Sequence, residues 1–441
     1  MVDVHEVFST SITLDEVEKA NQDFEQVSKE PSTQVVRLCH ASTLLPLKHE
    51  RYHHAFIPFS PLLCAFYAGS DQGQGDTSIY VVRIEADGSH SSVQKLDCPQ
   101  LNQKANSTPV LFYLNQAQEV RQRVKNDGGQ LKELPKGKVA TSAEHLIEDG
   151  HKLYPESNIT SGDDSIIALA YKAGKENSST VSYLSLSFND GKHFITPREM
   201  VEEQVSSGRG PVRTKPYLVR KGPFAGRVLL PCSVDNNEGL AFVDFSDDDF
   251  RTLSKSNEIT PSDEQKEASQ KAIFAHGVVQ SALFEDLGNH SCADNDLSSW
   301  SQEDLDKKRS KIHMLMSARG SQIYVADSDD AGQTFSAPYG VPLYNCNAGI
   351  DCVTYMNRLL LCGKLVTDKD KCDPEVGAPL AIYMSKDGKS FSELLRLEDD
   401  AQGIYTSPYM QVDRRHHLLY VSYTDHRHAI KIRIFRLILG H

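Results

Sequence analysis

The 441-residue sequence predicts an all-β protein, a single six-bladed antiparallel β-propeller that spans residues 1–441. Three features of the chain support this prediction: alternating apolar strands recur, each follows a more buried apolar strand, and several end in a similar polar turn. Units that repeat at roughly the period of one blade are typical of propellers, in which each unit covers the apolar face of its neighbour. We count six units.

The clearest unit is QIYVADSDDAGQTF, residues 322–335, in which a strand leads into a turn containing Ser328, Asp330, Gly332 and Phe335. Glycine adopts a positive φ without steric cost, and Ser and Asp side chains can hydrogen-bond the backbone N–H groups of such a turn. We therefore expect a structural role for it, on the outer rim. Eroded copies of the turn occur at residues 187–194, 246–250, 385–391 and 85–88.

The strands that accompany these turns form pairs along the chain. The more buried strand of each of the first five pairs is LLCAFYAG, IIALAYKAG, RVLLPCS, IHMLMSAR or RLLLCGKL. The strand that follows each is SIYVVRI, VSYLSLS, LAFVDFS, QIYVADS or APLAIYMS, and a sixth pair, HHLLYVSYT and AIKIRIFRLIL, ends the chain.

Three other segments depart from this repeat. Residues 1–35 are polar and run into PSTQVVRL, a strand that we expect to complete the last blade, because a ring needs a clasp to remove its open edge. Charged insertions are predicted near residues 113–160, with helical spacing in parts, and near 284–311.

Composition narrows the function. The net charge of −13 and the lack of a Lys/Arg run argue against a nucleic-acid partner, and no apolar run is long enough to span a membrane. The first residues lack the basic and apolar regions of a signal peptide, so we expect a cytoplasmic protein, with a secreted mature form as the alternative. His and Cys spacing predicts no metal site, and we expect no cofactor.

Chemistry is expected in the central channel, which the first strand of every blade lines. The polar residues near these blade openings are His40, Asn106, Arg213, Lys215, Gln280, Arg319, Asn347, Asp351, Tyr405, Arg427 and Lys431. The five cationic residues among them would form a basic pocket in an acidic protein, suited to a carboxylate. The alternative is that these groups hydrogen-bond channel water and loop backbone.

From His40 to Lys431 the chain resembles the branch of predicted neuraminidases in the sialidase superfamily, which carry Asp-box, or BNR, repeats. The matching blocks are His40 to Thr43, Gly69 to Asp76 followed by Tyr80, Gly210 to Pro216, Gly277 with Gln280, Asn347 to Asp351, and Tyr423-Thr424 with Arg427 and Lys431. The resemblance implies a sialidase-type propeller and an exo-glycosidase that acts on a terminal acidic sugar.

The resemblance also implies roles for single residues. Tyr405 would be the nucleophile and Asp76, or Asp71, the acid, while Glu285 and Glu238 are candidates for the carboxylate partner of Tyr405. Substrate would be bound by Arg213, Arg319 and Arg427, whose guanidinium groups would hold the sugar carboxylate, together with Lys215, Gln280, Asn347, Asp351 and Lys431.

One departure from the family keeps two alternatives open. Sialidases begin the first blade with an Arg in a Phe/Tyr-Arg-Ile-Pro motif, whereas this chain has His40-Ala41-Ser42-Thr43 there and no Arg in residues 54–58. Related propellers use a channel His on uronate-containing glycans, so a uronate lyase that uses His40 and Tyr405 is the second hypothesis. A non-catalytic propeller that binds a glycan or a protein is the third.

Overall fold

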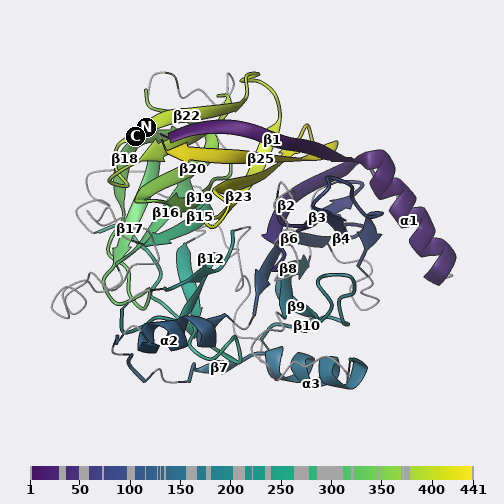
Figure 1. Ribbon diagram of the computed structural model, residues 1–441, viewed down its shortest axis with the longest axis horizontal. Coiled ribbons are helices and arrows are strands. Elements are labelled where there is room, and N and C mark those ends of the chain that lie inside the picture. The colour runs from purple at the N-terminus through teal and green to yellow at the C-terminus, as the bar shows by residue number, and fades with distance from the viewer. Residues whose placement is uncertain are drawn as a thin grey trace.

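The computed structural model is mostly β-sheet, with three helices in the part of the chain that it describes (Figure 1). That part comprises residues 2–28, 36–48, 59–71, 74–96, 105–114, 116–126, 128–129, 131–133, 136–154, 166–174, 180–201, 214–220, 222–233, 240–262, 278–285, 311–318, 322–345, 348–368, 371 and 378–439.

The strands form antiparallel sheets that follow one another along the chain. One sheet has the order β2 (Leu38–Pro46), β3 (Leu62–Gly69), β4 (Ser78–Ile84) and β5 (Gln94–Lys95). The next has β6 (Ala105–Tyr113), β8 (Ile167–Gly174), β9 (Val181–Ser187) and β10 (Arg198–Glu199). A third has β11 (Tyr217–Leu218), β12 (Val228–Ser233), β13 (Ala241–Ser246), β14 (Thr252–Lys255) and β7 (Val139–Ala140).

The second half of the chain continues the pattern. A larger sheet contains β15 (Val278–Glu285), β16 (Ile312–Ala318), β17 (Gln322–Ser328) and β18 (Tyr339–Asn345), followed by β20 (Arg358–Val366), β21 (Leu380–Ser385) and β22 (Phe391–Glu398). Its two halves join only at Tyr344↔Val366 and Asn345↔Leu365, and β19 (Asp351–Tyr355) pairs with β20. The last sheet has β23 (Tyr405–Asp413), β24 (Leu418–Asp425), β25 (Ala429–Leu439) and β1 (Val2–Thr13).

All six predicted strand pairs are confirmed. They are β3–β4, β8–β9, β12–β13, β16–β17, β20–β21 and β24–β25. Figure 1 shows the sheets in chain order around a common centre.

The core lies between the sheets. Five clusters of buried apolar side chains each join two neighbouring sheets, and a sixth joins the two halves of the larger sheet. One of the five joins β2–β4 to β23–β25 at the two ends of the chain. Each sheet is thus covered on both faces, which explains why β3, β8, β12 and β20 are mostly apolar.

The N-terminal strand is not where the sequence predicted it. Residues 2–13 form β1 and pair with β25 along most of its length, whereas 31–35, the first part of the expected strand 31–38, lie outside the described residues. Helix α1 (Leu14–Ser28) follows β1 directly and was not predicted. The polar side chains of β1 hid the alternation that buries Val2 and Ile12.

The predicted polar turns share one hydrogen-bond pattern. Ser328 Oγ donates to Asp330 Oδ1 at 2.8 Å and accepts from Gly332 N at 2.8 Å, and Asp330 Oδ1 also accepts from Thr334 N at 2.8 Å. The turns that begin at residues 187, 246 and 385 repeat these bonds.

One turn is more strained than the others. Phe250 occupies the glycine place of the turn at 246–250 with a φ of 65°. Its ring packs 4.8 Å from Phe112, and this burial offsets a backbone conformation that is costly for a bulky residue. The fifth predicted turn, at 85–88, is held differently, by bonds from Ser89 to Asp87 Oδ1.

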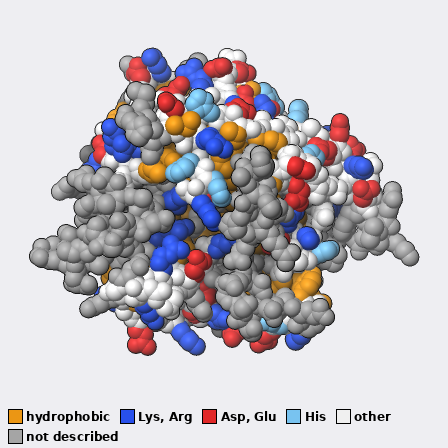
Figure 2. All heavy atoms as spheres, in the orientation of Figure 1, with side chains coloured by type: hydrophobic (Ala, Val, Ile, Leu, Met, Phe, Trp, Pro, Cys, Tyr) orange, Lys and Arg blue, Asp and Glu red, His pale blue; other side chains and the backbone are white. Residues whose placement is uncertain are grey.

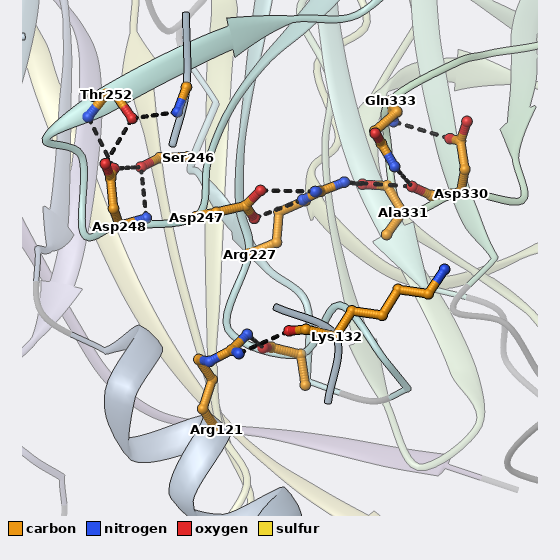
Figure 3. Close-up of polar contacts among 12 residues, drawn as sticks. Arg121, Lys132, Arg227, Ser246, Asp247, Asp248, Thr252, Asp330, Ala331 and Gln333 are labelled. Carbon is orange, nitrogen blue, oxygen red and sulfur yellow. Dashed lines mark hydrogen bonds and ion pairs between the residues drawn. The ribbon is translucent and has the colours of Figure 1, made fainter. Parts of the chain in front are cut away.

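Arg227 connects two of these turns (Figure 3). Its Nε and Nη2 donate to the two carboxylate oxygens of Asp247 at 2.8 Å, and its Nη1 reaches the carbonyl oxygen of Ala331 at 3.3 Å. The guanidinium lies between the rings of Phe224 and Phe245.

Two helices lie within the first predicted insertion. Helix α2 (Ala117–Asn126) is attached to the segment between β11 and β12, since Arg121 donates to the carbonyl oxygen of Ala225 at 3.1 Å. Arg121 also donates to the carbonyl oxygen of Lys132, within the insertion, at 3.0 Å (Figure 3). Helix α3 (Ala143–Leu153) packs on β9. Nearly all of the second predicted insertion, residues 286–310, lies outside the described residues.

Candidate functional site

The first strands of the six strand groups surround one cavity of about 260 Å³. These inner strands are β2, β6, β11, β15, β19 and β23. Each contributes lining residues near the end at which it finishes, among them Leu45, Tyr113, Tyr217, Leu283, Val353 and Val412. We call this end the exit end of the channel, and the end at which the inner strands begin the start end. Of the blade-opening residues that the sequence selected, His40, Asn106, Gln280 and Tyr405 lie at the start end, near the first residues of β2, β6, β15 and β23.

Three inner strands carry the same bulge at the start end. Register shifts interrupt β2, β6 and β23 near their first residues, and each bulge contains one residue at positive φ: Ala41 (54°), Thr108 (52°) or Ser407 (51°). A bulge re-aims the side chains beside it and is frequent next to functional sites. The sequences HAST, NSTP and YTSP carry this shared geometry.

His40 lies in the bulge of β2 and contacts the last sheet. Its Nδ1 lies 3.0 Å from Oγ1 of Thr424, and its Nε2 lies 3.4 Å from Oγ of Ser407. The imidazole is buried and packs edge-on against Tyr67, with ring centroids 5.5 Å apart. Sequence reasoning selected His40 but missed Ser407 and the role of Thr424.

Gln280 brings a third inner strand to the same place. Its side chain is 1% exposed, and Oε1 lies 2.2 Å from the point where a Cβ on Gly349 would sit. That point is also 3.7 Å from Cα of Ser407. Gly349 is therefore required by close approach, and four sheet segments meet here. Among the described residues, neither Oε1 nor Nε2 of Gln280 has a hydrogen-bond partner.

Lys215 and Asp351, both predicted to bind substrate, bind each other. Lys215 Nζ lies 2.7 Å from both carboxylate oxygens of Asp351, and Asp351 Oδ2 accepts from Met410 N at 2.6 Å. Burial raises the pKa of Asp351, against the lowering effects of Lys215 and of the backbone N–H groups of Met410 and Cys352. The ammonium also lies 5.1 Å from the ring centre of Tyr409.

Tyr405 lies at the first position of β23 among charged groups. Its ring packs edge-on against His426, with centroids 5.0 Å apart, and Nζ of Lys431 lies 5.9 Å from its centre. Lys431 itself binds Glu398 at 2.8 Å and Asp425 at 3.3 Å. The pKa of the Tyr405 hydroxyl is raised by burial first, and then by the charges of Glu398 and Asp425.

These contacts correct the expected partner of Tyr405. Glu285 lies at the exit end of β15, where Oε2 accepts from the hydroxyl of Tyr217 at 3.2 Å, so it cannot serve a tyrosine at the start end. The carboxylates whose charges act on Tyr405 are Glu398 and Asp425, and Glu238 lies outside the described residues.

The remaining predicted residues are placed as follows. Asp76 Oδ2 accepts from Ser70 N at 3.2 Å, and the carbonyl oxygen of the next residue, Thr77, accepts from Asn106 Nδ2 at 2.7 Å at the start of β6. Arg427 is exposed on the turn between β24 and β25, and its carbonyl oxygen accepts from Cys39 N at 2.8 Å. Arg213, Arg319 and Asn347 lie outside the described residues.

No group of three His, Cys, Asp or Glu side chains in the described ranges is arranged to hold a metal ion. No helix in those ranges is both long and apolar enough to cross a bilayer.

Comparison with solved structures shows the fold. A protein of unknown function from Dyadobacter fermentans matches with a TM-score of 0.55 and 12% identity over 99% of both chains. A Hadza microbial sialidase matches with a TM-score of 0.53 and 11% identity, over 90% of this chain and 65% of the sialidase chain. The Trypanosoma rangeli sialidase matches with a TM-score of 0.53 and 9% identity, over 91% of this chain and 55% of the sialidase chain. Its structure is a complex with 2,3-difluorosialic acid as a covalent intermediate. The chain thus spans less than two thirds of either sialidase.

Comparison with protein families identifies the family of this chain. No curated protein matches the chain. The family described as "BNR repeat-like domain" matches residues 135–421, more than half of the sequence. The two sialidases share the β-propeller fold with this chain, and the chain belongs to the BNR repeat-like domain family.

Proposed function

We propose that the protein is a glycan-active enzyme of the sialidase type, an exo-glycosidase that removes a terminal acidic sugar. Its site is at the start end of the channel, and its scaffold is a closed six-bladed propeller. The six apolar clusters, one between each pair of neighbouring strand groups and one between the last group and the first, support six blades.

One observation supports this location above the others. Gln280 has a buried amide without a hydrogen-bond partner among the described residues, at the point where β15 meets Gly349, Ser407 and, through Ser407, His40. An unsatisfied buried polar group costs about 1–3 kcal/mol, so a protein retains one where a ligand can satisfy it. An amide offers both a donor and an acceptor, which match the adjacent hydroxyl and acyl groups of a sugar.

The hydrolytic mechanism assigns roles to the nearby groups. Tyr405 would attack the anomeric carbon and lose its proton as it does so, because its pKa is raised in the free protein. Glu398 and Asp425 are the carboxylates whose charges reach it and could accept that proton. Asp76, beside the start of β6, would protonate the leaving oxygen. Arg213 and Arg319, with Arg427, would hold the sugar carboxylate.

A second candidate is elimination on a uronate, and the position of His40 favours it. Its Nδ1 lies 3.0 Å from Oγ1 of Thr424 and its Nε2 lies 3.4 Å from Oγ of Ser407, which places the imidazole at the start end beside β23. An imidazole at this place could remove the C5 proton of a uronate, provided that cations neutralise the carboxylate and so acidify that proton. A propeller that binds glycans or proteins without catalysis is the remaining alternative.

Substitution of Gln280 by Met tests the proposal. Replacement of an unsatisfied amide by an apolar group of similar size should leave the free energy of unfolding unchanged or slightly higher. Turnover of sialosides or uronate-terminated glycans should nevertheless fall at least tenfold, as measured by released reducing ends and by the absorbance of unsaturated product. Gln94→Met, an exposed change on β5, is the matched control.

Full activity in Gln280→Met would place the sugar site elsewhere. Inactivity of the wild-type protein on every glycan of the panel, with binding retained, would leave the non-catalytic alternative. The product distinguishes the two enzymes, since only elimination generates an absorbing double bond.

A further inference from the structure

The turn between β24 and β25 has an unusual backbone conformation for its sequence. The carbonyl oxygen of Asp425 accepts from His428 N at 2.9 Å, and the two residues between them, His426 and Arg427, have positive φ angles of 49° and 60°. Turns with positive φ at both central residues favour Asn and Gly, because most side chains are strained there. Strained residues cluster at functional sites, so the side chains of this turn are candidates for a function.

The backbone contacts of the turn do not account for its side chains. His426 N donates to the carbonyl oxygen of Ile404 at 2.8 Å, and the carbonyl oxygen of Arg427 accepts from Cys39 N at 2.8 Å. Asn-Gly at the same two positions would make these bonds with less strain. Arg427 already has a role in the proposed function, as a partner of the sugar carboxylate, whereas His426 has none.

The imidazole of His426 is held at one nitrogen. Its Nδ1 lies 2.6 Å from Oδ1 of Asp425, whose Oδ2 lies 3.3 Å from Nζ of Lys431. Its ring packs edge-on against Tyr405, and the side chain is 45% exposed. When Nδ1–H donates to the carboxylate, the neutral imidazole has its acceptor at Nε2, which forms no hydrogen bond within the described part of the chain.

The turn lies next to the buried groups of the start end. Thr424 and Ser407, which contact the two nitrogens of His40, are on β24 and β23. His426 follows Thr424 by two residues, Tyr405 precedes Ser407 by two residues, and Tyr405 pairs with the residue before His426. The two strands therefore lead from buried polar groups to the exposed imidazole over a short distance.

Charge and exposure alone do not distinguish this place. Figure 2 shows Asp, Glu, Lys and Arg side chains mixed over the face that it presents, with His side chains among them. A second exposed pair of this kind joins His416 Nδ1 to Asp413 Oδ2 at 2.7 Å, in the turn that follows β23 at the exit end. What distinguishes His426 is its contact with Tyr405 and its position at the start end.

We propose that His426 binds the second sugar of the glycan, through a hydrogen bond from a sugar hydroxyl to Nε2. The inference rests on the proposed function, in which the terminal sugar lies at Gln280, a residue that is 1% exposed. The sugar attached to it has to lie nearer to solvent, where the side chain of His426 is 45% exposed and Ile404 is 49% exposed. An imidazole already held by Asp425 loses little entropy when it binds.

Calorimetric titration of the full chain with single sugars and with longer glycans tests this role. The probes are sialic acid with sialyllactose, and glucuronate with glucuronyl-N-acetylglucosamine. The parent protein is Tyr405→Phe, which lacks the proposed nucleophilic hydroxyl but keeps the ring that contacts His426. Sialyllactose or the glucuronyl disaccharide should bind the parent more tightly than its single sugar does. His426→Asn should weaken binding of the longer glycan about tenfold and leave the Kd of the single sugar unchanged.

Two further variants control the experiment. His416→Asn removes an imidazole of similar exposure, also held by an aspartate, from the other end of the channel, and it should change neither Kd. Gln280→Met should weaken both the single sugar and the longer glycan, because it acts on the terminal sugar. Asn adopts positive φ more readily than most residues, so His426→Asn should unfold at the same temperature as the parent.

Each outcome decides the inference. It is wrong, while the proposed function stands, if the longer glycan binds no more tightly than the single sugar, or if His426→Asn weakens both equally or neither. If wild-type protein binds the longer glycan without turnover and His426→Asn weakens that binding selectively, the inference stands and the proposed activity fails. If no probe binds at millimolar concentration, both are overturned.

Discussion

Removal of the Lys215 charge should destabilise the protein strongly, because it would leave the Asp351 carboxylate buried without a cation. The side chain of Asp351 is 1% exposed and that of Lys215 is 16% exposed, so water replaces the lost ammonium poorly. Loss of one partner of a buried ion pair typically costs about 3–5 kcal/mol. We expect Lys215→Met to lower the free energy of unfolding by about that amount at pH 8, in urea unfolding followed by circular dichroism.

The effect should depend on pH with a defined sign. The pKa of Asp351 is raised in the folded protein, so the folded state binds more protons than the unfolded state between the ordinary and the raised pKa. Stability therefore falls as pH rises through that window. Because Lys215 lowers this pKa, its loss moves the upper limit of the window to higher pH. The deficit of Lys215→Met should thus be smaller at pH 5 than at pH 8.

Two variants control the experiment. Lys371→Met breaks an exposed pair, in which Nζ lies 3.8 Å from Asp368 and the lysine side chain is 75% exposed, and it should cost no more than about 1 kcal/mol. The double variant Lys215→Met/Asp351→Asn removes both charges and should recover much of the loss. A loss in Lys215→Met no larger than that in Lys371→Met, or one that grows at pH 5, would refute the argument.

Three further predictions concern catalysis and the turns. His40→Ala should reduce kcat by about 10²–10⁴-fold with the fold intact if the imidazole moves a proton, whereas full activity with an inactive Tyr405→Phe would establish the hydrolase. Asp330→Ala removes the acceptor of four turn hydrogen bonds and should lower the free energy of unfolding by about 1–3 kcal/mol, and an equal effect of the exposed Asp329→Ala would contradict this. The pKa of Asp387 is lowered to about 2 by hydrogen bonds from its own turn, against the raising effect of burial, so its contribution to stability should be present above about pH 4 and lost between about pH 4 and 2. Asp387→Asn should remove that part of the acid titration in unfolding measurements.

Local patterns in the sequence predicted the strands and turns well, for physical reasons. A strand with a neighbour on each face must be apolar on both, so β3, β8, β12 and β20 are visible as mostly apolar runs. The turn at 328–335 is held by bonds within eight residues, so its spacing alone predicts it. Strand β1 was missed because its strongly polar side chains mask the alternation, and what orders it is pairing with a strand more than 400 residues away.

The site could be predicted only as a set of positions. The sequence shows that Lys215 and Asp351 both lie near the start of an inner strand, but only the structure shows that they neutralise each other. The contacts of Gln280 with Gly349, and of His40 with Thr424, arise from the packing of different sheets. Such contacts leave no local pattern, because they depend on how the strand groups are placed around the channel.

The two parts of the functional proposal rest on different residues and can fail separately. The groups that the structure brings together at the start end, His40, Gln280 and Ser407, are donors and acceptors that can serve the hydroxyl groups of any sugar. The cations of the predicted pocket that are described there do not supply a carboxylate site by themselves, since Lys215 and Lys431 bind carboxylates of the chain and Arg427 is exposed. Preference for an acidic sugar therefore depends on Arg213 and Arg319. If these two arginines do not face the channel, Gln280 would still mark a sugar site, but one for a neutral sugar.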